Sequence, residues 1–349
     1  MTTSPEQTVA GLGEQALIER IRARVPAAPA WVAIGMGDDA AVVEPARNRA
    51  EVITTDTLVE GVHFDLAYVP ASAVGHKALA VGLSDLAAMG AEPRAALLSL
   101  VLPGEMRATE FDEMMDGWFA LARRYGVALV GGNISRSPGP LVVDVTAIGS
   151  VKPRRVLTRS GARPGDGIYV SGSVGAACAG RLALRGGSGG LRAPAEGGEN
   201  AAGGIAACEA RFLRPEPRIR LGVLLGRNQA ASASVDLSDG LGDGVRQLAA
   251  ASGVGAEIDG DAVPVPEAAR RWFEDREGLD ALDAAVSGGE DYELLFTVPA
   301  RRRRALSAVL SLAGGLPCTR IGTVTADGRV TLTRRGVKSS LPGGFAHFR

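Results

Sequence analysis

Residues 78–103 read ALAVGLSDLAAMGAEPRAALLSLVLP, and this stretch joins two secondary-structure patterns. The apolar residues of 71–89 recur with the spacing of a helix. The segment 95–102 is a short continuous apolar run, which is typical of a buried strand. A long helix followed directly by a buried strand predicts a mixed α/β fold.

The same alternation continues on both sides of this stretch. Further helices are expected at 14–25, 109–125, 217–225 and 241–251, and the basic run 301–304 is interpreted as the solvated start of another. Strands are expected at 31–34, 40–43, 51–55, 127–130, 141–151, 167–170, 232–237, 256–259, 292–298 and 321–325. Helices and strands therefore interleave along the whole chain, which places it in the mixed α+β class.

A length of 349 residues exceeds one typical core, so two domains are expected. The Gly- and Pro-rich segment 157–172, LTRSGARPGDGIYVSG, places the boundary near residue 152. We therefore expect an N-terminal domain at 1–151 and a C-terminal domain at 152–349. The glycine-rich segment 186–204 is predicted to be a mobile surface loop, because it offers little apolar surface to bury.

The composition excludes several classes of protein. Hydrophobic residues make up 46% and charged residues 22%, and the formal net charge is −1, so no basic field favours nucleic acid or an anionic membrane. Three widely spaced cysteines predict neither a disulfide framework nor a zinc site. With no signal peptide and no apolar run of about 18 residues, we expect a cytoplasmic protein.

The common nucleotide-binding and hydrolase motifs are absent, and aspartates in small-residue loops stand out instead. Asp38 and Asp39 could form an ordinary turn, and Asp56 could cap a following element. Asp85 is harder to explain structurally, because its helical neighbours are apolar and a carboxylate on a buried face is costly. Asp236 or Ser238 could cap the helix that follows.

Together these aspartates indicate a site for several hard metal ions. The carboxylates concerned are Asp38, Asp39, Asp56, Asp85, Asp236 and Asp239. Mg²⁺ bound with phosphates fits them best, because magnesium takes a few carboxylates together with water and substrate oxygens.

Long strings of the sequence resemble the thiamine-monophosphate kinases, a family within the aminoimidazole ribonucleotide synthetase-like superfamily. The resemblance runs from about residue 13 to 348, and its strings are IGMGDDAAVV, TTDTLVEGVHF, ALAVGLSDLAAMGAEPRAALLSLVLP, VLTRSGARPGDGIYVSG, FLRPEPRI, VDLSDGL and SGGEDYELLFTV. It implies a two-domain ATP-binding fold whose N-terminal sheet pairs across a homodimer. It also implies transfer of the γ-phosphoryl group of ATP to thiamine monophosphate.

The resemblance also implies roles for individual residues. The implied Mg²⁺ ligands are Asp39, Thr55, Asp56, Asp85, Asp236 and Asp239, with Asn133 at a further ligand position. The implied ATP contacts are Gly132, Asn133, Arg159 and Ser238, and the implied substrate contacts are His63, Glu290 and Phe345. The residue types alone do not single out His63, Arg159, Glu290 or Phe345.

Two positions depart from the family's pattern. The family's Gly-Gly-Asp-Thr loop reads Gly131-Gly132-Asn133-Ile134 here, which removes one expected carboxylate. Phe345 stands where a tyrosine or tryptophan is more usual. We predict that the Asn133 side chain faces the nucleotide and metals. The alternative is that Asn133 only forms a turn.

The chemistry of the acceptor sets the expected mechanism. A phosphate monoester is largely dianionic at neutral pH, so it needs no general base, and the enzyme must instead neutralise charge and align two polyanions. We expect direct in-line transfer with no catalytic group beyond the metal ligands and Arg159. Phe345 and Glu290 suit the cationic thiazolium and the aminopyrimidine.

Two other functions stay open from the sequence. One is another ATP-dependent reaction of the same superfamily, such as aminoimidazole ribonucleotide or selenophosphate synthesis. A selenophosphate synthetase would need a reactive cysteine near the N-terminal glycine-rich loop, but the first cysteine is Cys178. The other is a binding protein that has lost turnover, which Asn133 suggests.

Overall fold

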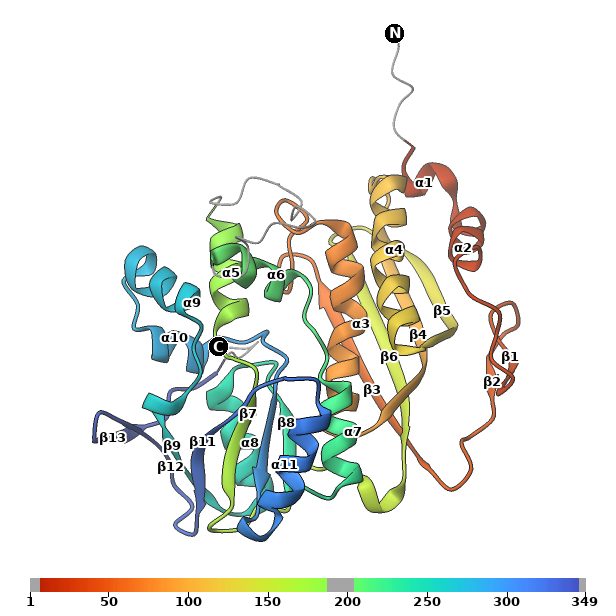
Figure 1. Cartoon of the computed structure of the whole chain (residues 1–349). Coiled ribbons are helices and arrows are strands. Elements are labelled where there is room, and N and C mark those ends of the chain that lie inside the picture. The colour runs from red at the N-terminus through yellow and green to blue at the C-terminus, as the bar shows by residue number, and fades with distance from the viewer. Residues whose placement is uncertain (1–6, 187–203, 345–349) are drawn as a thin grey trace. The chain divides into compact units, whose positions relative to one another are not determined.

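The computed structural model describes residues 7–186 and 204–344. Most of the predicted glycine-rich loop (187–203) and Phe345 lie outside the described residues. The chain divides into two compact units, one formed by residues 1–86 and 92–152 and the other by residues 87–91 and 153–349 (Figure 1).

The first unit is built on a four-stranded mixed sheet in the order β3-β6-β4-β5, in which only β4 and β5 are parallel. Its elements are α1 (Val9–Leu12), α2 (Glu14–Arg22), β1 (Val32–Ile34), β2 (Val42–Val43), β3 (Ala50–Val59), α3 (Ala71–Ala88), β4 (Glu92–Pro103), α4 (Ala108–Tyr125), β5 (Ala128–Ser137) and β6 (Val142–Val151). The short strands β1 and β2 form a separate antiparallel pair.

Helices α3 and α4 run side by side next to this sheet (Figure 1). Glycines allow their close approach, since a Cβ atom at Gly75 would lie 1.8 Å from the Met114 carbonyl oxygen and one at Gly117 would lie 1.9 Å from that of Ser72. On the opposite face of the sheet, which we call the open face, several described side chains are exposed. Ile53 is 66% exposed there and Leu97 is 37% exposed.

The second unit contains a seven-stranded mixed sheet in the order β13-β12-β9-β11-β7-β10-β8. Its strands are β7 (Gly167–Ser171), β8 (Ala233–Asp236), β9 (Gly255–Asp259), β10 (Leu294–Val298), β11 (Cys318–Thr325), β12 (Val330–Arg334) and β13 (Val337–Ser340). Its α-helices are α5 (Ala176–Arg185), α6 (Ile205–Leu213), α7 (Ile219–Arg227), α8 (Leu241–Ser252), α9 (Glu267–Trp272), α10 (Ala281–Ser287) and α11 (Arg303–Leu312).

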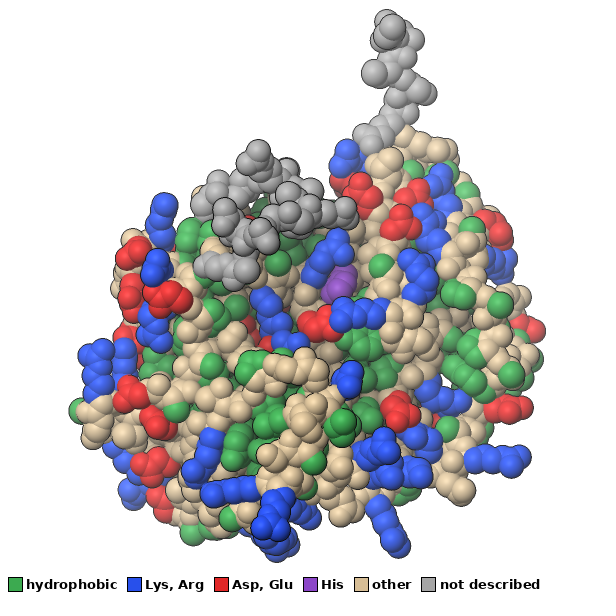
Figure 2. Space-filling model, in the orientation of Figure 1, with side chains coloured by type: hydrophobic (Ala, Val, Ile, Leu, Met, Phe, Trp, Pro, Cys, Tyr) green, Lys and Arg blue, Asp and Glu red, His purple; other side chains and the backbone are tan. Residues whose placement is uncertain are grey.

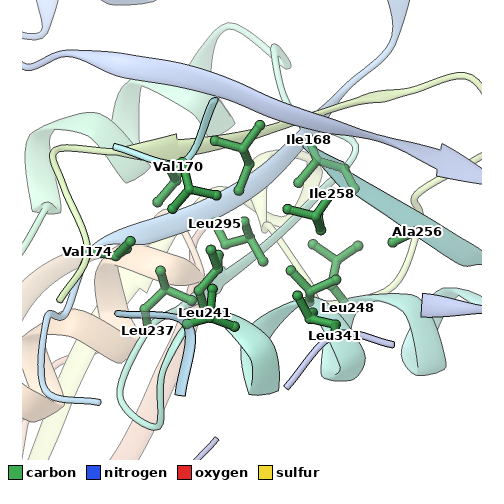
Figure 3. Packing of buried hydrophobic residues seen from close by; sticks show 14 of the residues in the cluster. Ile168, Val170, Val174, Leu237, Leu241, Leu248, Ala256, Ile258, Leu295 and Leu341 are labelled. Atoms are coloured by element: carbon green, nitrogen blue, oxygen red, sulfur yellow. The ribbon is translucent and has the colours of Figure 1, made fainter. Parts of the chain in front are cut away.

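The main core of the second unit lies between this sheet and α8 (Figure 3). Ile168 and Leu295 project from the sheet and pack with Leu241 and Leu248 of the helix, and all four side chains are buried. This packing stabilises the start of α8, which directly follows the VDLSDG segment singled out in the sequence.

The structure confirms most of the predicted elements and corrects three interpretations. Strand β3 continues to Val59, so Asp56 lies inside a strand and does not cap a helix or turn. Strand β5 continues to Ser137, so Asn133 also lies within a strand and not in a turn. The N-cap of α8 is Gly240, without a side-chain capping bond, so neither Asp236 nor Ser238 caps that helix.

No helix in the described part of the chain is both long enough and apolar enough to cross a membrane.

Candidate active site

Two predicted ligands, Asp56 and Asp85, meet in the first unit. Along β3 the side chains alternate, and Thr54 and Asp56 point toward α3, which carries Asp85. The Thr54 hydroxyl donates a 2.5 Å hydrogen bond to Asp85 Oδ2. A Cβ atom on Gly82 of α3 would lie 3.6 Å from Asp56 Oδ2, so this carboxylate faces α3 one turn before Asp85.

The Asp56 carboxylate is in an unusual electrostatic state. Burial, together with the nearby charges of Asp85 and Asp144, raises its pKa from 3.8 to about 7. Its Oδ2 atom is buried and has no hydrogen-bond partner among the described residues. Two neighbouring acidic groups and an unsatisfied buried oxygen are the environment that a divalent cation would relieve.

The open face of the same sheet carries a second polar group. Thr55 Oγ1 donates to Asp144 Oδ1 at 3.3 Å, and Thr57 also donates to the Asp144 carboxylate. Thr55 therefore points away from its neighbour Asp56. Sequence reasoning missed Asp144, although the alternation of apolar and polar residues in 142–148 was a signal for a side chain on the exposed face.

Asn133 lies on β5 at the register position opposite Ser99 of β4, and Ser99 is in turn opposite Asp144 of β6. Its amide Nδ2 donates to Ser135 Oγ at 3.0 Å, and the side chain is exposed. At Gly132 a Cβ atom would lie 1.9 Å from the Leu98 carbonyl oxygen, so this position admits only glycine.

The remaining predicted residues of the first unit lie in two loops. Asp38 and Asp39 lie between β1 and β2 and are exposed, and the Asp39 N–H donates to Asp38 Oδ1 at 2.9 Å, as in an ordinary turn. His63 accepts a 3.0 Å bond from the Val59 N–H through Nδ1. The ammonium of Lys77, a residue only 1% exposed that sequence reasoning overlooked, donates to the His63 carbonyl oxygen.

In the second unit, Asp236 is the last residue of β8 and is buried, while Ser238 and Asp239 lie in the loop that leads to α8. Ser238 Oγ is 3.4 Å from Asp239 Oδ2. The three residues therefore follow one another at the end of a strand.

A second loop, residues 288–293, is hydrogen-bonded to the segment 236–239 through its backbone. The Glu290 N–H donates to the Ser238 carbonyl oxygen at 2.7 Å, and the Tyr292 N–H donates to that of Leu237 at 2.9 Å. A Cβ atom at Gly289 would lie only 2.3 Å from the Ser238 carbonyl oxygen. The predicted substrate contact Glu290 is thus fixed beside the predicted ATP and metal contacts of the same unit.

Two predictions concern features outside these hydrogen-bonded groups: the ATP contact Arg159 and a metal site of several carboxylates. The Arg159 side chain is exposed, and its carbonyl oxygen accepts a 3.2 Å bond from Ser252 Oγ. Across residues 7–186 and 204–344, no three His, Cys, Asp or Glu side chains converge as a set that could hold a metal ion. Magnesium usually needs only one or two protein carboxylates, because waters and phosphates complete its shell.

Comparison with known proteins identifies the family. The N-terminal and C-terminal domain models of AIR synthase related proteins match residues 37–151 and 163–335. The thiamine-monophosphate kinase of Salmonella typhimurium is 42% identical over 315 residues, which are 90% of this chain and 91% of that protein. This chain belongs to the thiamine-monophosphate kinase family.

Solved structures of thiamine-monophosphate kinases have the same fold. The enzyme from Stenotrophomonas maltophilia K279a is 41% identical with a TM-score of 0.77, over 90% of this chain and 95% of that one. AaThiL complexed with AMPPCP and TMP is 34% identical with a TM-score of 0.73, over 99% and 100%. The predicted two-domain fold and ATP-dependent kinase activity are therefore confirmed, and the alternative functions are not favoured.

Proposed function

We propose that this chain transfers the γ-phosphoryl group of ATP to the phosphate of thiamine monophosphate, giving ADP and thiamine diphosphate. The observation that carries the proposal is similarity to thiamine-monophosphate kinases along 90% of the chain, including one structure described as holding AMPPCP and TMP. The acidic residues that a phosphoryl transfer needs are present in both units.

The proposed metal is Mg²⁺. In the first unit, Asp56 and Asp85 are the best-supported ligands, because Asp56 Oδ2 is buried without a hydrogen-bond partner among the described residues. In the second unit the proposed ligands are Asp236 and Asp239, and Asp39, Thr55 and Asn133 complete the proposed set. When bound, magnesium would neutralise charge on the phosphates and polarise the transferred group.

We propose direct in-line transfer without a phosphoenzyme. The acceptor phosphate is already nucleophilic at neutral pH, so the side chains of this chain need only bind and align it. Gly132 would contact the phosphates through its backbone, while its missing side chain leaves room for the Leu98 carbonyl oxygen of β4. Ser238 would contact the nucleotide, and Arg159, whose side chain is exposed, would steady the triphosphate.

Acceptor recognition is proposed for Glu290, His63 and Phe345. A carboxylate at Glu290 would pair with the aminopyrimidine or thiazolium of the acceptor, and the ring of Phe345 would attract the thiazolium cation. Glu290 has a left-handed backbone with φ of 77°, an arrangement that is costly for a non-glycine residue and is often found at functional sites.

We further propose a homodimer that forms through the open face of the four-stranded sheet. Ile53 of β3 and Leu97 of β4 expose apolar side chains there. No nucleic-acid or membrane partner is proposed, because the formal net charge is only −1, and Figure 2 shows acidic and basic side chains interspersed. We place the reaction in the cytoplasm, where ATP is supplied.

The test is a product assay with purified protein. ATP, Mg²⁺ and thiamine monophosphate are incubated with the chain, and thiamine diphosphate is separated by chromatography. Thiamine diphosphate should form at a rate proportional to the protein concentration. EDTA, which removes the Mg²⁺, should abolish its formation. ATP consumption without thiamine diphosphate, or with release of inorganic phosphate alone, would contradict the proposal.

A further inference from the structure

The segment SGGEDYE ends on Glu293, whose side chain is 0% exposed. Its carboxylate accepts hydrogen bonds from two arginines and a serine. Arg211 Nη2 donates to Oε1 at 2.6 Å. Arg218 donates to both oxygens, with Nε 2.7 Å from Oε2. The Ser171 hydroxyl also donates to Oε2 at 2.6 Å. We call Glu293, Arg211, Arg218 and Ser171 the Glu293 network.

Three separate parts of the sequence build this network. Arg211 and Arg218 flank the FLRPEP segment, while Ser171 and Gly172 end the YVSG segment. A Cβ atom at Gly172 would lie 2.1 Å from Glu293 Oε1, so glycine is required there to admit the carboxylate. A buried ion cluster of this kind contributes little net stability, because desolvation offsets its attraction, but it specifies one arrangement of the groups it joins.

The residue two positions earlier, Asp291, provides a second attachment. Its carboxylate accepts hydrogen bonds from the Gly175 N–H at 2.7 Å and the Ala177 N–H at 3.0 Å, at the N-terminus of α5. Arg211 also donates to the Asp291 carbonyl oxygen at 3.1 Å. Asp291 and Glu293 therefore fix the chain immediately after Glu290 at two buried points.

The residues beside these anchors have an unfavourable backbone. Glu290 has φ of 77° and Tyr292 has φ of 50°, both in the left-handed region. This conformation is costly for a non-glycine residue and persists only when its surroundings hold it in place. Asp291 and Glu293 alternate along the chain with the strained residues Glu290 and Tyr292. Each strained residue is therefore next to a side chain that is fixed in the interior.

We propose that Glu293, held by Arg211 and Arg218, is a positioning residue that fixes the direction of Glu290 toward the cationic acceptor. This inference rests on the proposed function, in which Glu290 contacts thiamine monophosphate. Glu293 is buried and acts only through the backbone of residues 290–293. Its loss should therefore weaken acceptor binding more than ATP binding, since the loop 236–240 is also held by the burial of Leu237 and Leu241 in the core of the second unit.

The experiment compares Glu293→Gln and Glu290→Gln singly and together. Thiamine monophosphate binding is measured by calorimetry with AMPPCP and Mg²⁺ present, and KM values for both substrates are measured separately. We expect Glu293→Gln to raise the acceptor Kd about tenfold while the ATP KM changes less than about twofold. In the Glu290→Gln background, the same substitution should raise the acceptor Kd less than about twofold.

Two further variants keep the inference falsifiable. Arg218→Lys retains the charge but cannot make the paired contact, so it should reproduce the effect more weakly even if Glu293→Gln folds poorly. Asp166→Asn is the matched control, because Asp166 is also buried and accepts a hydroxyl bond of 2.7 Å, from Ser232, near the opposite end of β8. It should leave the acceptor Kd unchanged.

The outcomes separate the inference from the proposed function. Additive effects of Glu293→Gln and Glu290→Gln, equal rises in both KM values, or no effect of Glu290→Gln on acceptor affinity would each overturn the positioning role. Wild-type protein that binds the acceptor but forms no thiamine diphosphate would overturn the proposed function, while the binding cycle would still decide the role of Glu293.

Discussion

The hydroxyl of Thr54 on β3 donates a 2.5 Å hydrogen bond to the carboxylate of Asp85 on α3. This bond holds Asp85 on the side of the sheet toward which Asp56 also points, so two acidic side chains share one partly buried space. Such an arrangement is unfavourable without a cation, and the first prediction follows from that cost.

Asp56→Asn should stabilise the metal-free protein while weakening its response to magnesium. Removing a carboxylate whose pKa is raised to about 7, first by burial and then by Asp85 and Asp144, should raise the free energy of unfolding by on the order of 1 kcal/mol at neutral pH. Thermal unfolding with and without MgCl₂ provides the measurement.

Magnesium should raise the Tm of the wild type more than that of the Asp56→Asn variant. Asp275→Asn, on an exposed residue, is the control, and an equal magnesium response in all three proteins would exclude Asp56 as a ligand.

Asn133→Asp should lower the magnesium concentration needed for half-maximal activity several-fold. Asn133 is exposed and its amide donates a hydrogen bond to Ser135, so an added carboxylate would be available to a cation. A unit charge at short range is worth a few kcal/mol before desolvation is subtracted. Initial rates are measured against free Mg²⁺ at saturating ATP, with Ser135→Ala as the control for loss of the local hydrogen bond. Superimposable curves for wild type and Asn133→Asp would show that Asn133 does not act on the metal.

Ile53→Glu should convert the protein to a monomer. Ile53 is 66% exposed on the open face of the four-stranded sheet, and a buried unpaired charge in a self-associating apolar face is costly. Analytical ultracentrifugation measures the oligomeric state. Val337→Glu is the matched control, because Val337 is 69% exposed on β13 of the other unit. Equal sedimentation of both variants as dimers would rule out this face as the interface.

Asp291→Asn should change how stability depends on pH. Burial raises the pKa of Asp291 from 3.8 to about 7, against the opposing effect of the Gly175 and Ala177 N–H groups. Between pH 3.8 and about pH 7, Asp291 is protonated in the native state but ionised in the unfolded state. The free energy of unfolding therefore falls as the pH rises through this range. The amide of the variant does not titrate. The stability of the wild type relative to the variant should therefore decrease between about pH 4 and pH 7 in urea titrations; a constant difference would contradict this assignment.

The fold was largely predictable because long, regular apolar patterns determine it. The helix at 71–89 and the strand at 95–102 were predicted close to their observed bounds, as α3 and β4. The ends of β3 and β5 were not, because Asp56, Gly132 and Asn133 break the apolar pattern while the strands continue through pairing with β6 and β4. Pairing partners far apart in sequence decided these bounds.

The candidate site was predictable only where the residue type carries a cost. Asp85 stood out because its helical neighbours are apolar, and it does lie beside a second carboxylate. Asp144 and Glu293 did not stand out, because each is surrounded in sequence by strand-forming residues and finds its partners through tertiary contacts. The strained φ of Glu290 likewise has no sequence signal, since glutamate rarely has this conformation.

Direct transfer from ATP to thiamine monophosphate can be measured by a single-turnover quench. Enzyme in excess over γ-labelled ATP is mixed with thiamine monophosphate and Mg²⁺, quenched over time, and separated into nucleotide, thiamine phosphates, inorganic phosphate and protein. We predict that label leaves ATP and enters thiamine diphosphate at one common rate, with none retained on the protein. Label accumulating on a side chain before thiamine diphosphate forms, or label recovered only as inorganic phosphate, would contradict it.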